Sequence, residues 1–267
     1  MKKQILRLAA LALAVLAVIL IHKRVRYEAE EAERLAVEAM EQSAVLSEEV
    51  QQRSILRAGA GVELGVMTEN TERGGVDVTV TGADGTQTTY TFTDVAIDSW
   101  YADAVNFVVS AGLMNGSAGD SLFRPEYGML RESFALAIYR FAGGDPPETR
   151  VTFEDVADGQ WYQDAIGWVV NEGLLMPAEE NVFGVGKYMT CEQAIVGLYR
   201  LAGEPETDGS LADYPYAAKV SGYGRSAMDW AWKNGLITEV ECVWYPPQTI
   251  SRAQLALLLE RFSKKIS

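Results

Sequence analysis

A cysteine stands at the predicted start of a helix in "YMTCEQAIVGLYRLAG", residues 188–203. Thr190 and Gln193 have the spacing of a capping box, and apolar residues then recur at helical intervals. Because a helix N-terminus lowers the pKa of a thiol, Cys191 is a candidate nucleophile or redox centre. A nucleophilic thiol also needs a base, so the rest of the chain decides between this interpretation and a structural one.

The chain offers few partners for such chemistry. Its one histidine, His22, lies in a basic cluster beside an apolar segment, and Cys191 and Cys242 lack the CxxC spacing of a zinc site. No GxGxxG, P-loop or HExxH pattern occurs. We therefore expect no enzyme activity, no metal and no cofactor. Glycan hydrolysis by paired carboxylates stays open as a minor alternative, because Asp and Glu are plentiful.

The charge of the chain argues against nucleic acid as a partner. The 267 residues carry a formal net charge of -14. Six of the 23 Lys and Arg residues precede residue 28, where there is no acid, so the remainder carries 17 bases against 37 acids. Such a surface repels phosphate backbones.

The first 27 residues predict a targeting segment. Fourteen unbroken apolar residues, 8–21, follow a basic start and precede "HKRVRY". Because no small-x-small cleavage site follows them, an uncleaved signal anchor is favoured over a cleaved signal peptide. We expect the chain to be held in the membrane by this segment, with the remainder in the extracytoplasmic cell envelope.

Two further segments separate this anchor from the body of the chain. Residues 28–57 lack Gly and Pro and are rich in Glu and Ala, which predicts a helical stalk. A coiled-coil homo-oligomer through a thin apolar stripe is the alternative to a solvated stalk. Residues 58–91 form a linker, and "VDVTVTGADGTQTTYTF", residues 76–92, predicts a short β-hairpin around Asp84 and Gly85.

The remainder of the chain repeats. "FTDVAIDSWYADAVNFVVSAGL" (92–113) and "FEDVADGQWYQDAIGWVVNEGL" (153–174) align without a gap, and "GYGRSAMDWAWKNGL" (222–236) is a divergent third copy. Each copy precedes a loop and a second amphipathic segment: "LRESFALAIYRFAG" (130–143), "TCEQAIVGLYRLAG" (190–203) and "SRAQLALLLERFSK" (251–264). Each unit is thus helix, loop and helix, and three such units should pack into one body.

These residues resemble the S-layer homology (SLH) domain. The shared pattern is F-x-D-V, W-Y-x-x-A-(V/I), G-L, an (I/T)-x-R-x-(E/Q) helix start and Y-R-(F/L)-A-G. The resemblance implies a mainly α fold in which three tandem repeats form a pseudo-threefold trimer. Grooves between the repeats would bind secondary cell-wall polysaccharide, which often carries pyruvylated sugars. The expected domains are a signal anchor or signal peptide (1–27), a helical stalk (28–57), a linker with the β-hairpin (58–91) and SLH repeats 1 (92–150), 2 (151–209) and 3 (210–267).

Candidate glycan contacts come from the residues and from the resemblance together. Arg131 and Arg252 stand at predicted helix starts, where a cation opposes the helix dipole, but where a guanidinium and free N–H groups would receive a carboxylate. The alternative is that each arginine pairs with an acid such as Glu132. Trp100 and Trp161 open the first helices, and either stack on sugars, as the resemblance implies, or cover the helix start as core residues.

Only the first repeat keeps Trp100, Gly116 and Arg131 together, so we expect one competent groove, or two. In the second repeat Cys191 replaces the arginine, which makes that repeat mainly structural. A disulfide between Cys191 and Cys242 is an open possibility for an exported protein.

The expected function is thus that of a non-enzymatic envelope protein whose SLH trimer binds cell-wall polysaccharide and tethers the protein to the bacterial surface. The alternative is an envelope protein–protein scaffold with degenerate grooves.

Overall fold

The computed structural model describes residues 62–116, 120–147 and 151–266. The chain divides into two compact units, Met1–Glu49 and Val50–Ser267, and all described residues belong to the second. The predicted signal anchor, the stalk and any oligomer formed through the stalk therefore lie outside the described residues. Within the described ranges, no helix is long and apolar enough to cross a membrane.

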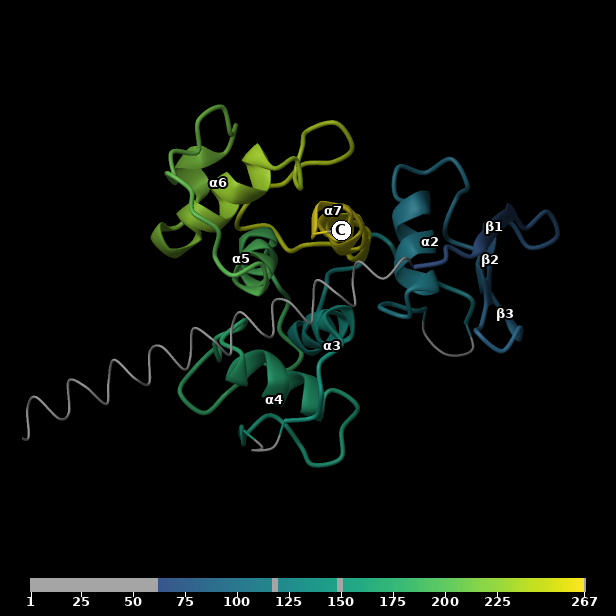
Figure 1. Ribbon diagram of the computed structural model, residues 1–267, viewed down its shortest axis with the longest axis horizontal. Coiled ribbons are helices and arrows are strands. Elements are labelled where there is room, and N and C mark those ends of the chain that lie inside the picture. Colours follow the sequence, from purple (N-terminus) through teal and green to yellow (C-terminus); the bar gives the residue numbers. More distant parts are fainter. Residues whose placement is uncertain (1–61, 117–119, 148–150, 267) are drawn as a thin grey trace, which may run out of the picture. The chain divides into compact units, whose positions relative to one another are not determined.

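The described residues form a small sheet followed by six α-helices (Figure 1). The strands are β1 (Val66–Glu69), β2 (Val76–Thr81) and β3 (Gln87–Phe92). The helices are α2 (Ala102–Ser110), α3 (Arg131–Ala142), α4 (Gln163–Asn171), α5 (Cys191–Leu201), α6 (Arg225–Lys233) and α7 (Arg252–Ile266). Two short 3-10 turns, Ala217–Lys219 and Gly222–Gly224, precede α6.

The predicted hairpin is confirmed, and it is part of a larger sheet. The antiparallel order is β1-β2-β3, with Val76 opposite Phe92 and Thr81 opposite Gln87 across the hairpin. Strand β1 was not predicted, because its sequence "VMTE" is short and largely exposed and does not alternate. The sheet adds a third strand, which a lone hairpin needs for stability in water.

Helix α2 ties the sheet to the helical part of the chain. The Gly65 N–H donates to Ser110 Oγ over 2.8 Å, and Asn106 Nδ2 donates to the Gly65 carbonyl over 3.0 Å. Val76 and Val78 of β2 are fully buried and belong to the same core as α2. The predicted linker is therefore packed against the first helix of the repeat region.

We use segment 1 for residues 92–150, segment 2 for 151–209 and segment 3 for 210–267. The helices pair between these segments: α3 packs on α4, α5 packs on α6, and α7 returns to pack on α2 (Figure 1). The second helix of each segment thus packs on the first helix of the next, and segment 3 closes the cycle on segment 1.

Main-chain hydrogen bonds close the same cycle at the starts of α3, α5 and α7. The Met129 N–H donates to Ile250 O over 2.9 Å, Ile250 N–H to Met189 O over 3.0 Å, and Met189 N–H to Met129 O over 2.8 Å. All three side chains are buried. This closed cycle is what a pseudo-threefold arrangement requires, and the trimer of three SLH repeats itself stays a prediction.

Equivalent positions in the three segments have equivalent environments. Phe107, Trp168 and Trp230 are each 7% exposed, as expected for core residues. Gly112 and Gly173 follow the last turns of α2 and α4 with φ of 68° and 66°, the left-handed conformation that ends a helix without strain in glycine. The tryptophans expected to open the first helices instead precede them by two residues, because α2 begins at Ala102 and α4 at Gln163.

Candidate ligand-binding pockets

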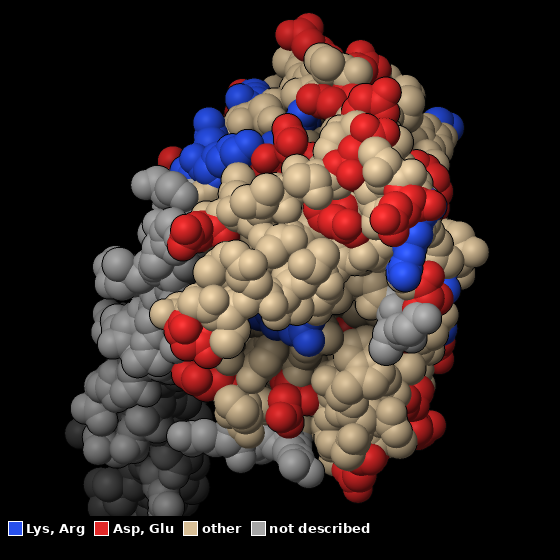
Figure 2. Space-filling model, turned by 90° about the vertical axis from the view of Figure 1, so that its right-hand side faces the viewer, with Lys and Arg blue, Asp and Glu red and all other residues tan. Residues whose placement is uncertain are grey.

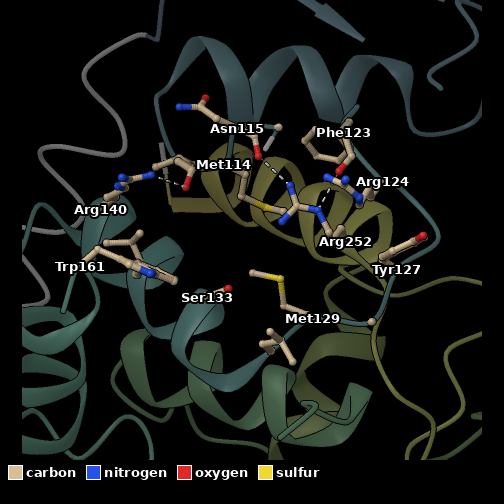
Figure 3. A pocket seen from close by; sticks show the side chains of 15 residues that line it. Met114, Asn115, Phe123, Arg124, Tyr127, Met129, Ser133, Arg140, Trp161 and Arg252 are labelled. Atoms are coloured by element: carbon tan, nitrogen blue, oxygen red, sulfur yellow. Dashed lines mark hydrogen bonds between the residues drawn. The ribbon is translucent and has the colours of Figure 1, made fainter. Parts of the chain in front are cut away.

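Three pockets of similar size lie around the helix starts that form the central cycle. The first, of about 570 Å³, is built from segment 1 with Trp161 and Arg252 (Figure 3). The second, of about 480 Å³, is built from segment 2 with Arg131 and Tyr223. The third, of about 500 Å³, joins Trp100, Glu126 and Gly128 to the loop before α7. The first two pockets therefore each take residues from all three segments.

Arg252 forms one side of the first pocket and is held by the loop of segment 1. Its Nε donates to the Phe123 carbonyl and its Nη2 to the Asn115 carbonyl, each over 2.8 Å (Figure 3). The guanidinium lies 4.8 Å from the centre of the Phe123 ring. Two carbonyls and a ring face fix the guanidinium, and they leave other N–H groups for a ligand.

Arg131 repeats this arrangement in the second pocket. Its Nε donates to the Phe183 carbonyl over 2.9 Å and its Nη2 to the Met176 carbonyl over 2.8 Å. The guanidinium lies 4.9 Å from the centre of the Phe183 ring. Burial lowers the pKa of Arg131, but an arginine stays protonated at neutral pH.

The alternative that each arginine pairs with an acid does not hold within the described residues, where neither Arg131 nor Arg252 forms an ion pair. Glu132, the acid considered as a partner, accepts the Gly186 N–H over 3.0 Å instead. Carbonyl oxygens screen the positive charge less than a carboxylate would. Both guanidinium groups therefore keep a net attraction for anions.

We use junction for each place where the start of α3, α5 or α7 meets the loop of another segment. At the third junction, between the start of α5 and the loop before α7, Cys191 takes the place of the arginine. Its side chain is 0% exposed, and burial raises the pKa of the thiol to about 12. The buried Trp244 stands where the other junctions have Phe123 and Phe183, and the Tyr214 hydroxyl donates to the Trp244 carbonyl, which an arginine Nε would otherwise reach. A buried, protonated thiol is inert, which favours the structural interpretation of Cys191 over the nucleophilic one.

The two cysteines are both free thiols. Cys242 is half-buried at the third pocket, where Gln254 Nε2 approaches its Sγ at 3.9 Å. The disulfide with Cys191 that the sequence allowed is therefore not formed in this structure.

An exposed aromatic side chain lines each pocket. Trp161 is 58% exposed in the first, Tyr223 is 62% exposed in the second, and Trp100 is 36% exposed in the third. The rings of Trp100 and Trp161 meet the following tyrosine edge-on, with centroids 5.0 Å apart in both. Such exposure does not fit the alternative that these tryptophans are core residues.

The structure divides the set of Trp100, Gly116 and Arg131 that the sequence placed in one groove. Gly116 lines the first pocket with Arg252 and Trp161, Arg131 lines the second, and Trp100 lines the third. The reason is the cross-segment packing, which brings the arginine of one segment against the loop of another. The residues kept together in one repeat therefore do not share one pocket, and each of these pockets combines residues from different segments.

Two aspartates of the F-x-D-V pattern position the loops, a role that the sequence pattern did not reveal. Asp94 accepts the N–H groups of Phe123 and Arg124, and Asp155 accepts those of Phe183 and the two residues after it, at 2.7–2.8 Å. Burial raises the pKa of Asp155, but the three N–H donors outweigh it, and the net shift is downward. Both aspartates thus hold the carbonyls that bind the arginines.

Further pocket residues were not singled out from the sequence. Arg140 and Arg200 are the arginines of the recurring Y-R pair. Arg140 lines the first pocket and Arg200 the second, and both donate to loop carbonyls over 3.3–3.4 Å. That recurrence was the available signal. Tyr127 and Lys187 also line these pockets, but the residue type at their position varies between the copies, so no sequence signal marked them.

Comparison with known proteins agrees with this architecture in its first segment. Residues 91–135 match the S-layer homology domain family, and this stretch contains α2, the loop held by Asp94 and the first turn of α3. The match defines one SLH domain in the chain.

The relatives found are surface-layer proteins. The chain is 28% identical over 172 residues to the surface-layer 125 kDa protein of Lysinibacillus sphaericus, a match that covers 62% of this chain and 14% of that protein. It is 22% identical over 178 residues to the S-layer protein sap of Bacillus anthracis, covering 66% of this chain and 21% of that protein. The chain thus spans less than a quarter of either relative's length.

Proposed function

We propose that this chain is a non-enzymatic protein of the bacterial cell surface whose first and second pockets bind acidic units of a secondary cell-wall polysaccharide. The observation that carries the proposal is the charge of these pockets. The first is lined by Arg124, Arg140 and Arg252, and the second by Arg131, Lys187 and Arg200. Three of these cations, Arg124, Lys187 and Arg200, pair with acids outside the pockets, whereas Arg131, Arg140 and Arg252 form no ion pair within the described residues. None of the described residues that line either pocket is Asp or Glu. The similarity to surface-layer proteins supports the same role.

The contrast with the surrounding surface is strong. The whole chain has a formal net charge of -14, and Figure 2 shows acidic side chains scattered over the face turned toward the viewer, with fewer Lys and Arg. Long-range attraction therefore does not favour an anionic polymer. Its binding must rest on the local cations, and salt should weaken these contacts less than it weakens long-range steering.

The geometry suits a carboxylate attached to a sugar ring. A guanidinium fixed by two carbonyls presents its remaining N–H groups to a carboxylate or a ketal-linked pyruvate without further ordering. In the first pocket Trp161 offers a ring face to the apolar side of the sugar, and Ser133 offers a hydroxyl group (Figure 3). The second pocket has Tyr223 and Tyr188 in the corresponding roles.

We also propose that segments 2 and 3 are SLH repeats like segment 1. Support comes from the closed hydrogen-bond cycle of Met129, Met189 and Ile250, and from the equal placement of Arg131 and Arg252. Under this proposal the chain holds a pseudo-threefold SLH trimer. The predicted N-terminal anchor would then link this trimer to the membrane.

The test is sedimentation of the purified protein with wall sacculi of Lysinibacillus sphaericus, before and after acid extraction of the wall polymer. We expect the protein to sediment with untreated sacculi and to stay in solution with extracted ones. Equal sedimentation with both would point to peptidoglycan or to a protein partner, and no sedimentation with untreated sacculi would contradict the proposal.

A further inference from the structure

The third pocket differs from the other two in charge while it keeps their shape. Its volume of about 500 Å³ is similar, and Trp100 lines it as Trp161 lines the first pocket. Its other polar side chains in the described part of the chain are Glu126, Gln248, Thr249, Ser251 and Gln254, and none of its described lining residues is Lys or Arg. Three separate replacements produce this difference.

The first replacement removes the cation at the helix start. Where Arg131 and Arg252 reach the loops of the other two junctions, Cys191 is fully buried. Trp244 and Tyr214 fill the space beside it, so that no charged group replaces the arginine.

The second replacement neutralises the cation on the second helix. Arg261 of α7 corresponds to Arg140 and Arg200, and like them it donates to the carbonyl of a loop, here Leu236 O over 3.2 Å. It forms a close ion pair with Glu241, whereas Arg200 meets Glu204 only at 4.0 Å and Arg140 forms no ion pair within the described residues. The Glu241 carboxylate therefore neutralises the charge of Arg261 within segment 3.

The third replacement adds a carboxylate. Glu126 lies three residues after Phe123, and the same position holds Gly186 in segment 2 and Pro247 in segment 3. The Glu126 side chain is exposed at the third pocket and makes no ion pair within the described residues. Among the residues that the structure describes, a carboxylate thus lines this pocket and neither of the other two.

All three replacements shift the local charge in the same direction. We infer that the third pocket binds a sugar that carries a free amine, with Trp100 against the ring and the Glu126 carboxylate accepting from the ammonium group. Gln248 and Thr249 are exposed at its rim and would bind sugar hydroxyls. This inference rests on the proposed function, since the same wall polymer would then meet two anion-binding pockets and one amine-binding pocket on one protein.

The test uses two defined probes that differ in charge and acetylation. Chitotetraose carries free amines, and its fully N-acetylated form does not. Binding of each to the full-length protein is measured by isothermal titration calorimetry, at a pH low enough to protonate the amines. We expect chitotetraose to bind about fivefold more tightly than the acetylated form, because one exposed charge pair changes affinity by about that factor. Glu126→Gln should remove this preference, and Trp100→Ala should weaken binding of both probes about tenfold.

Two control variants separate a site from general attraction to an acidic surface. Glu180→Gln removes an exposed carboxylate that lines none of the three pockets, and Val240→Ala shortens an exposed apolar side chain that also lines none of them. Both should leave chitotetraose binding unchanged. The inference is overturned if neither probe binds, if the acetylated probe binds as well as the free amine, or if a control variant loses binding as Glu126→Gln does. Sedimentation with sacculi tests the proposed function separately, because it depends on the arginine pockets.

Discussion

Arg252 Nη2 donates a 2.8 Å hydrogen bond to the main-chain carbonyl of Asn115, although the two residues lie 137 positions apart in the sequence. The same guanidinium reaches the Phe123 carbonyl through Nε. One side chain thus links the start of the last helix to the loop of the first segment, at the place where the cycle of helices closes. The residue proposed to hold the ligand therefore also holds the fold.

This double role predicts a stability cost for Arg252→Ala. The variant leaves two loop carbonyls without their donor and removes the cation above the Phe123 ring. We expect the free energy of unfolding to fall by about 1–3 kcal/mol, measured by urea denaturation. Arg225→Ala is the control, since Arg225 is exposed and its bond to the Gly209 carbonyl lies outside the pockets. Equal losses in both variants would contradict the role assigned to Arg252.

Asp155 gives a prediction for pH. Its pKa is lowered in the folded state, so its contribution to stability is complete above the pKa of the unfolded chain, near 3.8, and is lost as the pH falls through the folded value. Asp155→Asn should cost about 1–2 kcal/mol at neutral pH, and less below about pH 3.

The matched control for this prediction is Asp213→Asn. Asp213 holds the same position in segment 3, but it is exposed and has a φ of 63°, a conformation that asparagine tolerates. We expect this variant to unfold like the unmodified protein at both pH values. An Asp155→Asn defect that does not depend on pH would show that the carboxylate charge plays no part.

The third junction predicts a compensated set of replacements. Cys191→Arg alone forces a long cation into space that Trp244 and Tyr214 already fill, so we expect a loss of about 1–3 kcal/mol or more. Adding Trp244→Phe and Tyr214→Val restores the residue types of the other junctions. The triple variant should regain most of that loss in urea denaturation. A triple variant less stable than Cys191→Arg alone would contradict the interpretation that Trp244 and Tyr214 fill the space of the missing arginine.

The sequence predicted the local elements well because their signals are local. Capping boxes at Thr190 and Ser251 are present in the structure, and α5 and α7 begin at the residues that follow them. The repeated spacing also placed Arg131 and Arg252 at the first residue of their helices. Hydrogen bonds between neighbours in sequence fix these positions, so the pattern of residue types was sufficient.

The composition of the pockets could not be predicted in the same way. Which loop receives Arg131 depends on the packing of α3 on α4, a contact between segments that no periodicity encodes. The sequence therefore grouped Trp100 with Arg131, because both belong to one repeat, whereas the structure groups Trp161 with Arg252. Likewise, the substitution of Cys191 was visible, but its compensation by Trp244 and Tyr214 required the contact between segments 2 and 3.

The most direct test of the central claim, that the arginine pockets bind the wall polymer, compares Trp161→Ala with Trp100→Ala in sedimentation with sacculi. Both variants remove an exposed tryptophan at equivalent positions, but only the pocket of Trp161 contains arginines. We expect Trp161→Ala to weaken sedimentation about tenfold and Trp100→Ala to weaken it by about threefold or less, because the third pocket would add only a weaker contact to the same polymer. Equal effects of the two variants, or a loss confined to Trp100→Ala, would contradict this claim.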